Sequence, residues 1–235
     1  MGEWRRHAIY FAPPENGPLA RFGAAWLGWD PVAGVPRGRG RVFAGLPCPR
    51  AELVAGPDRY GFHATLKAPF RLAAGCDEAG LREALAALAA RHRPFEIELG
   101  PGVMPGTQGK PGFVALMPTD EAPDLDPLAA ACVTELDGFR APLMPEEIAR
   151  RGSSLGRAER AHLARWGYPW VLDRFRFHMT LTRPVTGEEA AAVLQALIDP
   201  LTPFLSKLVP ITEICHFAEG EDGWFRVLGR YPLSG

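Results

Sequence analysis

The tetrapeptide pattern His-x-Thr-Leu occurs twice in this chain and constrains its fold more than any other feature of the sequence. One copy begins at His63 and the other at His178, each directly after a phenylalanine, and 178 − 63 = 115 residues separate them. For a chain with six histidines, random placement of threonine and leucine gives roughly 0.02 copies. Two copies half a chain length apart therefore predict an internal duplication, in which two similar units each contribute one motif.

Polar and apolar residues alternate around both motifs, as they do in a β-strand that buries one face. We expect one motif strand near residues 61–72 and the other near residues 174–183. Histidine and threonine two positions apart on a strand point to the same side, with their side-chain bases roughly 6.5–7 Å apart. The same alternation is expected to place Lys67 on the polar face of the first strand and Arg176 on that of the second.

Two such strands facing one cleft predict acid–base chemistry on a phosphate-sized group. Histidine titrates near neutral pH, so one of the imidazoles of His63 and His178 can accept a proton while the other donates one. The hydroxyls of Thr65 and Thr180 can hold the non-bridging oxygens of the same group. Lys67 and Arg176 are candidates for substrate contact. Charged residues at the solvent-exposed rim of a site show the same pattern without contacting a substrate. The sequence leaves open which histidine is the acid and which is the base.

The composition is that of an ordinary globular protein, with 47% hydrophobic and 23% charged residues over 235 positions. This length suits one bilobal domain over residues 1–235. A net charge of −1 argues against a broad surface for duplex DNA. The four cysteines show no metal-ligand or disulfide spacing, so we expect neither a metal ion nor another cofactor. The sequence shows no signal segment and no apolar stretch of transmembrane length, which predicts a cytoplasmic protein without membrane contact. We expect a monomer.

Other periodicities predict strands and helices on both sides of the motif strands. Strands are expected at residues 6–12, 95–99, 113–117, 211–217 and 224–231, with 95–99 and 113–117 paired through a Gly/Pro-rich loop at 100–112. Helices are expected at 19–29, 77–92, 126–136 and 188–198, and a charged helical stretch at 145–166 is interrupted by Gly152-Ser153-Ser154. Each half thus holds a motif strand, a helix and two further strands, which predicts an α+β fold.

The motifs and their flanks resemble the 2H phosphoesterase superfamily, which includes RNA 2′,3′-cyclic phosphodiesterases and LigT-like RNA 2′–5′ ligases. Within it, the segments 59–72 (RYGFHATLKAPFRL) and 166–182 (WGYPWVLDRFRFHMTLT), together with the opening HAIYFAP, are most similar to the bacterial DUF1045 branch. Members of that branch are associated with phosphonate-metabolism operons. The resemblance covers the whole chain, but only the two motifs transfer functional roles to it.

The resemblance implies that His63 and His178 are the catalytic pair and that Thr65 and Thr180 bind phosphate. It implies a LigT-like α+β fold of two pseudo-symmetric lobes, each an antiparallel sheet with helices on its outer face, which enclose a central cleft. The expected activity is metal-independent hydrolysis of a cyclic phosphodiester in a 2′,3′-cyclic nucleotide, an RNA end or a ribose cyclic phosphate. The near-neutral net charge favours a small ligand over long RNA. Two alternatives stay open: a nucleotide- or RNA-binding module without turnover, and an RNA 2′–5′ end ligase.

Other residues carry weaker signals. The aromatic residues of 166–170 can stack on a nucleobase, but such residues more often fill a core or a lobe interface. Segment 106–112 lacks the Lys-Ser/Thr ending of a phosphate loop and is interpreted as a hairpin loop. The arginines of 150–165 fit a solvated helix face. The remaining histidines have no repeated context and are assigned no role: His7, His92, His162 and His216.

Overall fold

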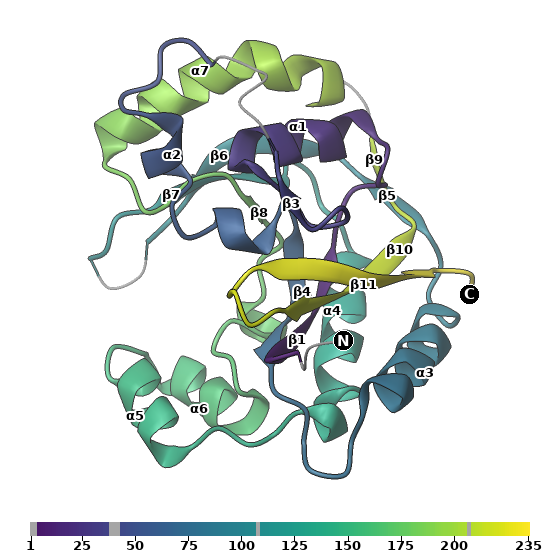
Figure 1. Cartoon of the computed structure of the whole chain (residues 1–235). Coiled ribbons are helices and arrows are strands. Elements are labelled where there is room, and N and C mark those ends of the chain that lie inside the picture. The colour runs from purple at the N-terminus through teal and green to yellow at the C-terminus, as the bar shows by residue number, and fades with distance from the viewer. Residues whose placement is uncertain (1–3, 38–42, 107–108, 206–207) are drawn as a thin grey trace.

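A seven-stranded antiparallel sheet organises the chain in the computed structural model, which describes residues 4–37, 43–106, 109–205 and 208–235 (Figure 1). The strand order is β11-β10-β1-β4-β8-β7-β6. Its strands are β1 (Arg6–Phe11), β4 (Ala64–Phe70), β6 (Leu99–Met104), β7 (Phe113–Pro118), β8 (Met179–Thr180), β10 (Glu213–Glu219) and β11 (Phe225–Pro232). Two small ribbons accompany it, formed by β2 (Trp29–Asp30) with β3 (Val35–Pro36) and by β5 (Phe95–Ile97) with β9 (Val209–Ile211). The predicted α+β class with an antiparallel sheet is confirmed.

Helices surround this sheet. They are α1 (Pro18–Leu27), α2 (Arg50–Leu53), α3 (Glu78–Ala89), α4 (Leu125–Thr134), α5 (Pro145–Gly152), α6 (Arg157–Trp166) and α7 (Gly187–Leu205), with 3-10 turns η1 (Asp58–Tyr60), η2 (Asp137–Phe139) and η3 (Leu172–Arg174). Helices α1, α3, α4 and α7 contribute buried residues to the main core. Figure 1 shows α1, α2 and α7 together at one end of the molecule and the α5–α6 pair at the other. In the part of the chain that the structure describes, no helix has the length and apolar character required to cross a membrane.

The two motif strands lie side by side at the centre of the sheet. They are joined through one antiparallel residue pair, Ala64 opposite Met179. We call this contact between β4 and β8 the seam. On one side of the seam, β4 pairs with β1, which is followed by β10 and β11. On the other side, β8 pairs with β7, which pairs with β6. The groups are therefore interleaved in sequence, because the group of β4 includes β10 and β11 from the end of the chain, whereas β8 is joined by β7 and β6, which precede it by more than 60 residues. The two halves of the chain thus share one sheet, although a single residue pair joins β4 to β8 directly.

The two faces of the sheet differ in what they bury. On β1, Ile9 and Phe11 join the large core beneath the helices. The intervening Tyr10 points to the opposite face, where it packs in a small cluster with Phe217 and Phe225. One face thus carries the main hydrophobic core, and the other carries a thin apolar floor on which a site can be built.

The predicted pairing of residues 95–99 with 113–117 is wrong. Strand β7 pairs instead with β6, which begins at the last residue of the expected strand and occupies Leu99–Met104, otherwise within the expected loop, and β5 pairs with β9. Glycine and proline in β6 indicated a loop. Because β6 is the outermost strand of the sheet, the missing N–H of Pro101 need not cost a ladder hydrogen bond, and the proline is tolerated there.

The second motif strand is shorter than the expected 174–183, since only Met179 and Thr180 have ladder pairing. The hydroxyl of Thr182 accepts the N–H of Val114 at 2.9 Å. A side chain thereby takes a place that a backbone carbonyl would hold in a longer ladder. The burial pattern nevertheless alternates along the segment, with Phe177 and Met179 buried and His178 between them half-buried.

Helix α7 extends to Leu205, beyond the expected end at residue 198, and contains Pro200 and Pro203. Its buried side includes Leu197 and Leu201, both with 0% exposure. The apolar stripe therefore continues past the first proline, and its burial against the core compensates for the hydrogen bonds that the prolines remove.

A buried histidine pair lies on the helix-covered face of the sheet. His7 of β1 and His216 of β10 are 3% and 0% exposed, and His7 Nδ1 lies 2.9 Å from His216 Nε2. His216 Nδ1 has no hydrogen-bond partner in the part of the chain that the structure describes. Burial lowers the pKa of His7, and burial together with the neighbouring His7 lowers that of His216 to about 3. From helix α3, Glu78 acts on His7 and Arg82 on His216. His216 is therefore neutral in the folded protein near pH 6, and burial favours the neutral form of His7 as well.

This pair predicts acid-sensitive stability. Below the unfolded histidine pKa of about 6.5 the unfolded chain takes up protons that folded His216 does not, so the free energy of unfolding falls as the pH falls. Between pH 7 and pH 5 we expect His216→Phe to remove about 2 kcal/mol of this loss. Denaturant titrations at both pH values measure it, with His92→Phe as the control. An unchanged pH dependence in His216→Phe contradicts the assignment.

Candidate active site

His63 directly precedes β4 and is positioned by a glycine turn. Gly61 has φ +74°, and a Cβ at this position would lie 2.6 Å from Pro31 Cγ, so the turn requires glycine. The next residue, Phe62, is buried in the main core. His63 therefore emerges on the opposite face, and its Nδ1 lies 2.9 Å from the Gly61 carbonyl oxygen.

The surroundings of His63 fix both its plane and its tautomer. The ring of Tyr10 stacks on the imidazole with centroids 3.8 Å apart and an interplanar angle of 26°. Because Nδ1 donates to a carbonyl, Nε2 is the acceptor nitrogen, and the Thr65 hydroxyl lies 3.3 Å from it. Burial lowers the pKa of His63 to about 4, and the neighbouring His178 contributes in the same direction. The resting imidazole is neutral and presents a lone pair.

His178 repeats this arrangement in the second motif. Its Nδ1 lies 2.7 Å from the carbonyl oxygen of Arg176, again two residues upstream, which leaves Nε2 free. The ring of Phe113 lies 5.4 Å from the imidazole. Burial lowers the pKa of His178, and the hydrogen bond to Arg176 opposes this shift. Both histidines thus reach the site with the same nitrogen pointing away from the backbone.

The seam between the motif strands sets the positions of the four motif side chains. With Ala64 opposite Met179 in an antiparallel pair, one step along each strand places His63 across from Thr180 and Thr65 across from His178. Directly opposed residues have Cβ atoms roughly 4.5–5.5 Å apart, and residues two apart on a strand are roughly 6.5–7 Å apart. Each histidine therefore faces the threonine of the other motif, at the corners of an area that matches one phosphate group.

A cleft of about 890 Å³ opens beside this group. It lies between the β6–β7 hairpin and the segment that leads into β8, and Thr65 and His178 both line it. Its walls carry aromatic rings and charged residues, among them Phe113, Tyr168, Trp170, Lys110, Asp126, Glu159, Arg174 and Arg176. Of the aromatic residues that the sequence suggested for stacking, Trp170 lines this cleft, Trp166 lines a second cavity, and Tyr168 lines both.

Arg176 and Lys67 differ in their availability for a ligand. Arg176 is exposed and lines the cleft, and its guanidinium donates to the carbonyl oxygen of Phe175 at 2.6 Å. No ion pair joins Arg176 to a carboxylate among the described residues. Lys67 is 3% exposed, donates to the Val133 carbonyl at 3.0 Å and lies 3.8 Å from Asp137. Burial lowers the pKa of Lys67 to about 8.

The expectation that Lys67 shares a face with His63 and Thr65 is wrong, and a β-bulge is the reason. In the pairing of β1 with β4, Tyr10 is opposite Thr65, but the preceding Ile9 is opposite Lys67. Leu66 is therefore an extra residue, and such an insertion breaks the two-residue alternation. Lys67 consequently turns to the helix-covered face, toward α4.

Tyr10 is a site residue that the sequence did not identify. The pattern of residues 6–12 predicts a strand, and alternation places the side chain of Tyr10 on the opposite face from its neighbours Ile9 and Phe11. The strand that pairs with the first motif could not be deduced, because β1 and β4 are joined by pairing between segments far apart in sequence. In the described residues, no group of three or more histidine, cysteine, aspartate or glutamate side chains is placed to hold a metal ion.

Known proteins are similar to this chain over part of their own length. The chain is 37% identical over 193 residues to a protein from Janthinobacterium sp. (strain Marseille) named Ribose 1,5-bisphosphate phosphokinase PhnN, covering 80% of this chain and 41% of that protein. A protein of the same name from Laribacter hongkongensis (strain HLHK9) is 38% identical over 177 residues, 75% of this chain and 40% of that protein. The chain thus spans about two-fifths of these relatives.

Among solved structures, LigT from E. coli in its apo form aligns over 100% of both chains with 17% identity and a TM-score of 0.44. The sequence profile of the DUF1045 family, described as a protein of unknown function, matches residues 65–226. That span contains Thr65 of the first motif and the whole of the second motif. The chain belongs to the DUF1045 family.

Proposed function

We propose that this protein is a metal-independent phosphoesterase that hydrolyses a cyclic phosphodiester with His63 and His178 as its acid–base pair. The observation that carries the proposal is the matched arrangement of the two imidazoles. Each directs Nδ1 to the carbonyl oxygen two residues upstream and turns Nε2 away from the backbone. Two histidines fixed in one tautomer on adjacent strands can serve opposite sides of one phosphorus atom.

The reaction needs one neutral and one protonated imidazole. The neutral imidazole takes a proton from water as the water oxygen forms a bond to phosphorus. The bond between phosphorus and one ring ester oxygen breaks, and the protonated imidazole donates its Nε2 proton to that oxygen. The product is a phosphomonoester beside a free hydroxyl, and proton exchange with solvent restores both histidines. Thr65 and Thr180 donate hydrogen bonds to the non-bridging oxygens, on which charge builds in the transition state.

Arg176 offers a positive charge to the proposed substrate. It lines the same cleft as Thr65 and His178, and no described carboxylate competes for its guanidinium. A guanidinium can bind a phosphate through two parallel hydrogen bonds. Lys67 is left out of this role because Val133 and Asp137 hold its ammonium group.

A ribose cyclic phosphate is the substrate class that the relatives favour. Two proteins named Ribose 1,5-bisphosphate phosphokinase PhnN contain a region similar to this chain, next to further sequence that the chain does not match. Opening a cyclic phosphodiester on ribose yields a ribose phosphate monoester, the same chemical class as the compound in that name. The association of the DUF1045 branch with phosphonate metabolism agrees with this choice.

A second candidate is a 2′,3′-cyclic nucleotide or an RNA end. The observation that favours it is the size of the cleft, about 890 Å³, and the rings of Phe113, Tyr168 and Trp170 in its walls. Such rings stack on nucleobases without strong sequence preference. A ribose phosphate alone leaves much of this volume empty.

The proposal is tested by turnover of a substrate panel in the presence of a chelator. Ribose cyclic phosphates, 2′,3′-cyclic nucleotides and RNA ends are compared for wild type, His63→Ala, His178→Ala and the control His92→Ala. We expect each active-site variant to lower kcat by roughly 10²–10⁴-fold, the usual contribution of a general acid or base. His92→Ala should retain wild-type turnover.

Full activity in both active-site variants, or loss of wild-type activity with chelator, overturns the mechanism. Tight nucleotide binding without turnover supports the binding module instead. Joining of RNA ends without net hydrolysis supports the ligase, since the same groups catalyse both directions of the reaction.

The pH dependence of kcat/KM should be bell-shaped with its maximum on the acid side of neutrality. The base must be neutral, so the rate falls below the pKa of the base, and the acid must be protonated, so the rate falls above the pKa of the acid. Both histidine pKa values are lowered, that of His63 to about 4. The maximum is therefore expected between about pH 4 and pH 6.5. A flat profile from pH 5 to pH 9, or a maximum above pH 7.5, speaks against the pair.

Tyr10 is expected to act as a positioning residue for His63. Tyr10→Phe keeps the stacked ring and should retain most activity, whereas Tyr10→Leu removes the stack and should lower kcat by about tenfold or more with little change in KM. The loss of ring cover should also raise the pKa of His63, which moves the acid limb of the pH profile upward. Phe11→Leu, the adjacent buried residue on the other face of β1, is the matched control. An unchanged acid limb in Tyr10→Leu rejects this role.

A further inference from the structure

A second cavity adjoins the proposed active site at the far end of β4. It shares Ala68, Tyr168 and Val171 with the cleft, so the two spaces are neighbours around the same segments. Ala68, where the two spaces meet, is three residues beyond Thr65, which corresponds to roughly 10 Å along a strand. The cavity measures about 20 Å³, room for about one water molecule.

Positive charge dominates the walls of this cavity. Five cationic side chains line it, and Glu147 is the one carboxylate among its described lining residues; the cations are Arg6, Lys67, Arg71, Arg140 and Arg151. Carboxylates outside the lining hold three of them: Glu219 binds Arg6, and Asp137 contacts Lys67 and Arg140. These ion pairs hold the side chains of Arg6, Lys67 and Arg140 in place from outside the cavity. Only Arg71 and Arg151 pair with a group inside the cavity.

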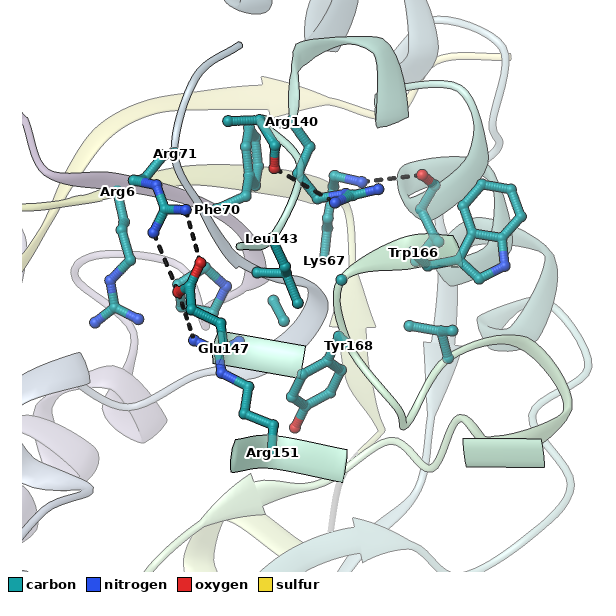
Figure 2. A pocket seen from close by; sticks show the side chains of 16 residues that line it. Arg6, Lys67, Phe70, Arg71, Arg140, Leu143, Glu147, Arg151, Trp166 and Tyr168 are labelled. Carbon is teal, nitrogen blue, oxygen red and sulfur yellow. Dashed lines mark hydrogen bonds and ion pairs between the residues drawn. The ribbon is translucent and has the colours of Figure 1, made fainter. Parts of the chain in front are cut away.

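That group is the carboxylate of Glu147 on α5 (Figure 2). It accepts two hydrogen bonds from Arg71, at 3.2 and 2.8 Å, and lies 3.7 Å from Arg151. It also accepts the N–H of Met144 at 3.0 Å. The hydrogen bonds from Arg71 lower the pKa of Glu147 to about 2. The carboxylate is therefore ionised near neutral pH and lies at the place where the surrounding cations would attract an external anion.

An external anion can replace the Glu147 carboxylate as the partner of Arg71. The Arg71 side chain is 45% exposed, and ion pairs of this kind contribute little net stability because water competes for both partners. A phosphate monoester carries more negative charge than a carboxylate and offers three acceptor oxygens. It can satisfy Arg71 and Arg151 together, and departure of the Glu147 side chain leaves space of similar size.

We propose that this cavity binds a second phosphate group of the substrate, a terminal phosphate monoester, in place of the Glu147 carboxylate. The inference rests on the proposed function in one respect: the cyclic phosphodiester at His63 and His178 and the terminal phosphate at Arg71 belong to one sugar. The site would then select a ribose cyclic phosphate that bears a further phosphate over one that does not. Glu147 holds the arginines in position while the site is empty.

Two substitutions separate this proposal from a purely structural salt bridge. Arg71→Ala and Glu147→Gln break the same contact, so a structural role predicts effects in the same direction. An anion site predicts opposite effects. Arg71→Ala should weaken binding of ribose 5-phosphate by about tenfold, and Glu147→Gln should strengthen it severalfold because the internal competitor loses its charge. Calorimetric titration with ribose 5-phosphate measures both, with inorganic phosphate as a second probe.

Arg82→Ala is the matched control, because Arg82 forms an i,i+4 ion pair with Glu78 on α3, away from the cavity. It should bind like wild type. Equal affinity in wild type, Arg71→Ala and Glu147→Gln, or a loss in both variants, overturns the site.

A kinetic experiment compares the KM values of ribose cyclic phosphates with and without a terminal phosphate. Arg71→Ala should change the ratio of the two KM values by about tenfold, against the phosphorylated substrate. An unchanged ratio overturns the inference even where turnover is normal. If no cyclic substrate is turned over but ribose 5-phosphate binding still responds in opposite directions to the two variants, the proposed function fails and the anion site stands.

Discussion

One antiparallel contact, between Ala64 and Met179, determines how the two motifs meet. It brings segments 115 residues apart into one sheet and sets which residue faces which across the seam. A shift of one residue would turn His178 and Thr180 toward the helix-covered core and Met179 toward the cleft, because side chains alternate along a strand. The full burial of Ala64 and Met179 opposes such a shift, since both have 0% exposure on the core side. Hydrophobic burial on one face thus fixes the polar arrangement on the other.

The sequence was sufficient to predict the local parts of this arrangement. Alternation around His63 and His178 gave the polar face of each motif, and the helices near 77–92 and 126–136 form close to their predicted bounds. Prediction failed where pairing between distant segments decides the outcome. The bulge at Leu66 arises from the register between β1 and β4, and it alone turns Lys67 away from Thr65. The stacking of Tyr10 on His63 depends on the same pairing. No local pattern around residue 10 or 67 contains that information.

The electrostatics of the empty site favour neutral imidazoles. Burial lowers the pKa of both His63 and His178, and the neighbouring His178 further disfavours protonation of His63. An acid–base pair nevertheless needs one proton. A phosphodiester carries negative charge, and its arrival near either Nε2 stabilises the protonated imidazole. The proposed chemistry therefore couples substrate binding to proton uptake, so that the protonated pair is most stable when the anion is present.

The interleaved strand order links ligand binding to the contact between the two strand groups. His63 and Thr65 belong to the group that contains β1, β10 and β11, whereas His178 and Thr180 belong to the group that contains β6 and β7. Among the described residues, one ladder pair joins the groups directly, so little backbone hydrogen bonding resists their separation at this point. A phosphate held by side chains of both motifs adds contacts across the same seam. Because a ligand that binds one arrangement stabilises that arrangement, the bound anion would itself strengthen the seam that creates its binding site.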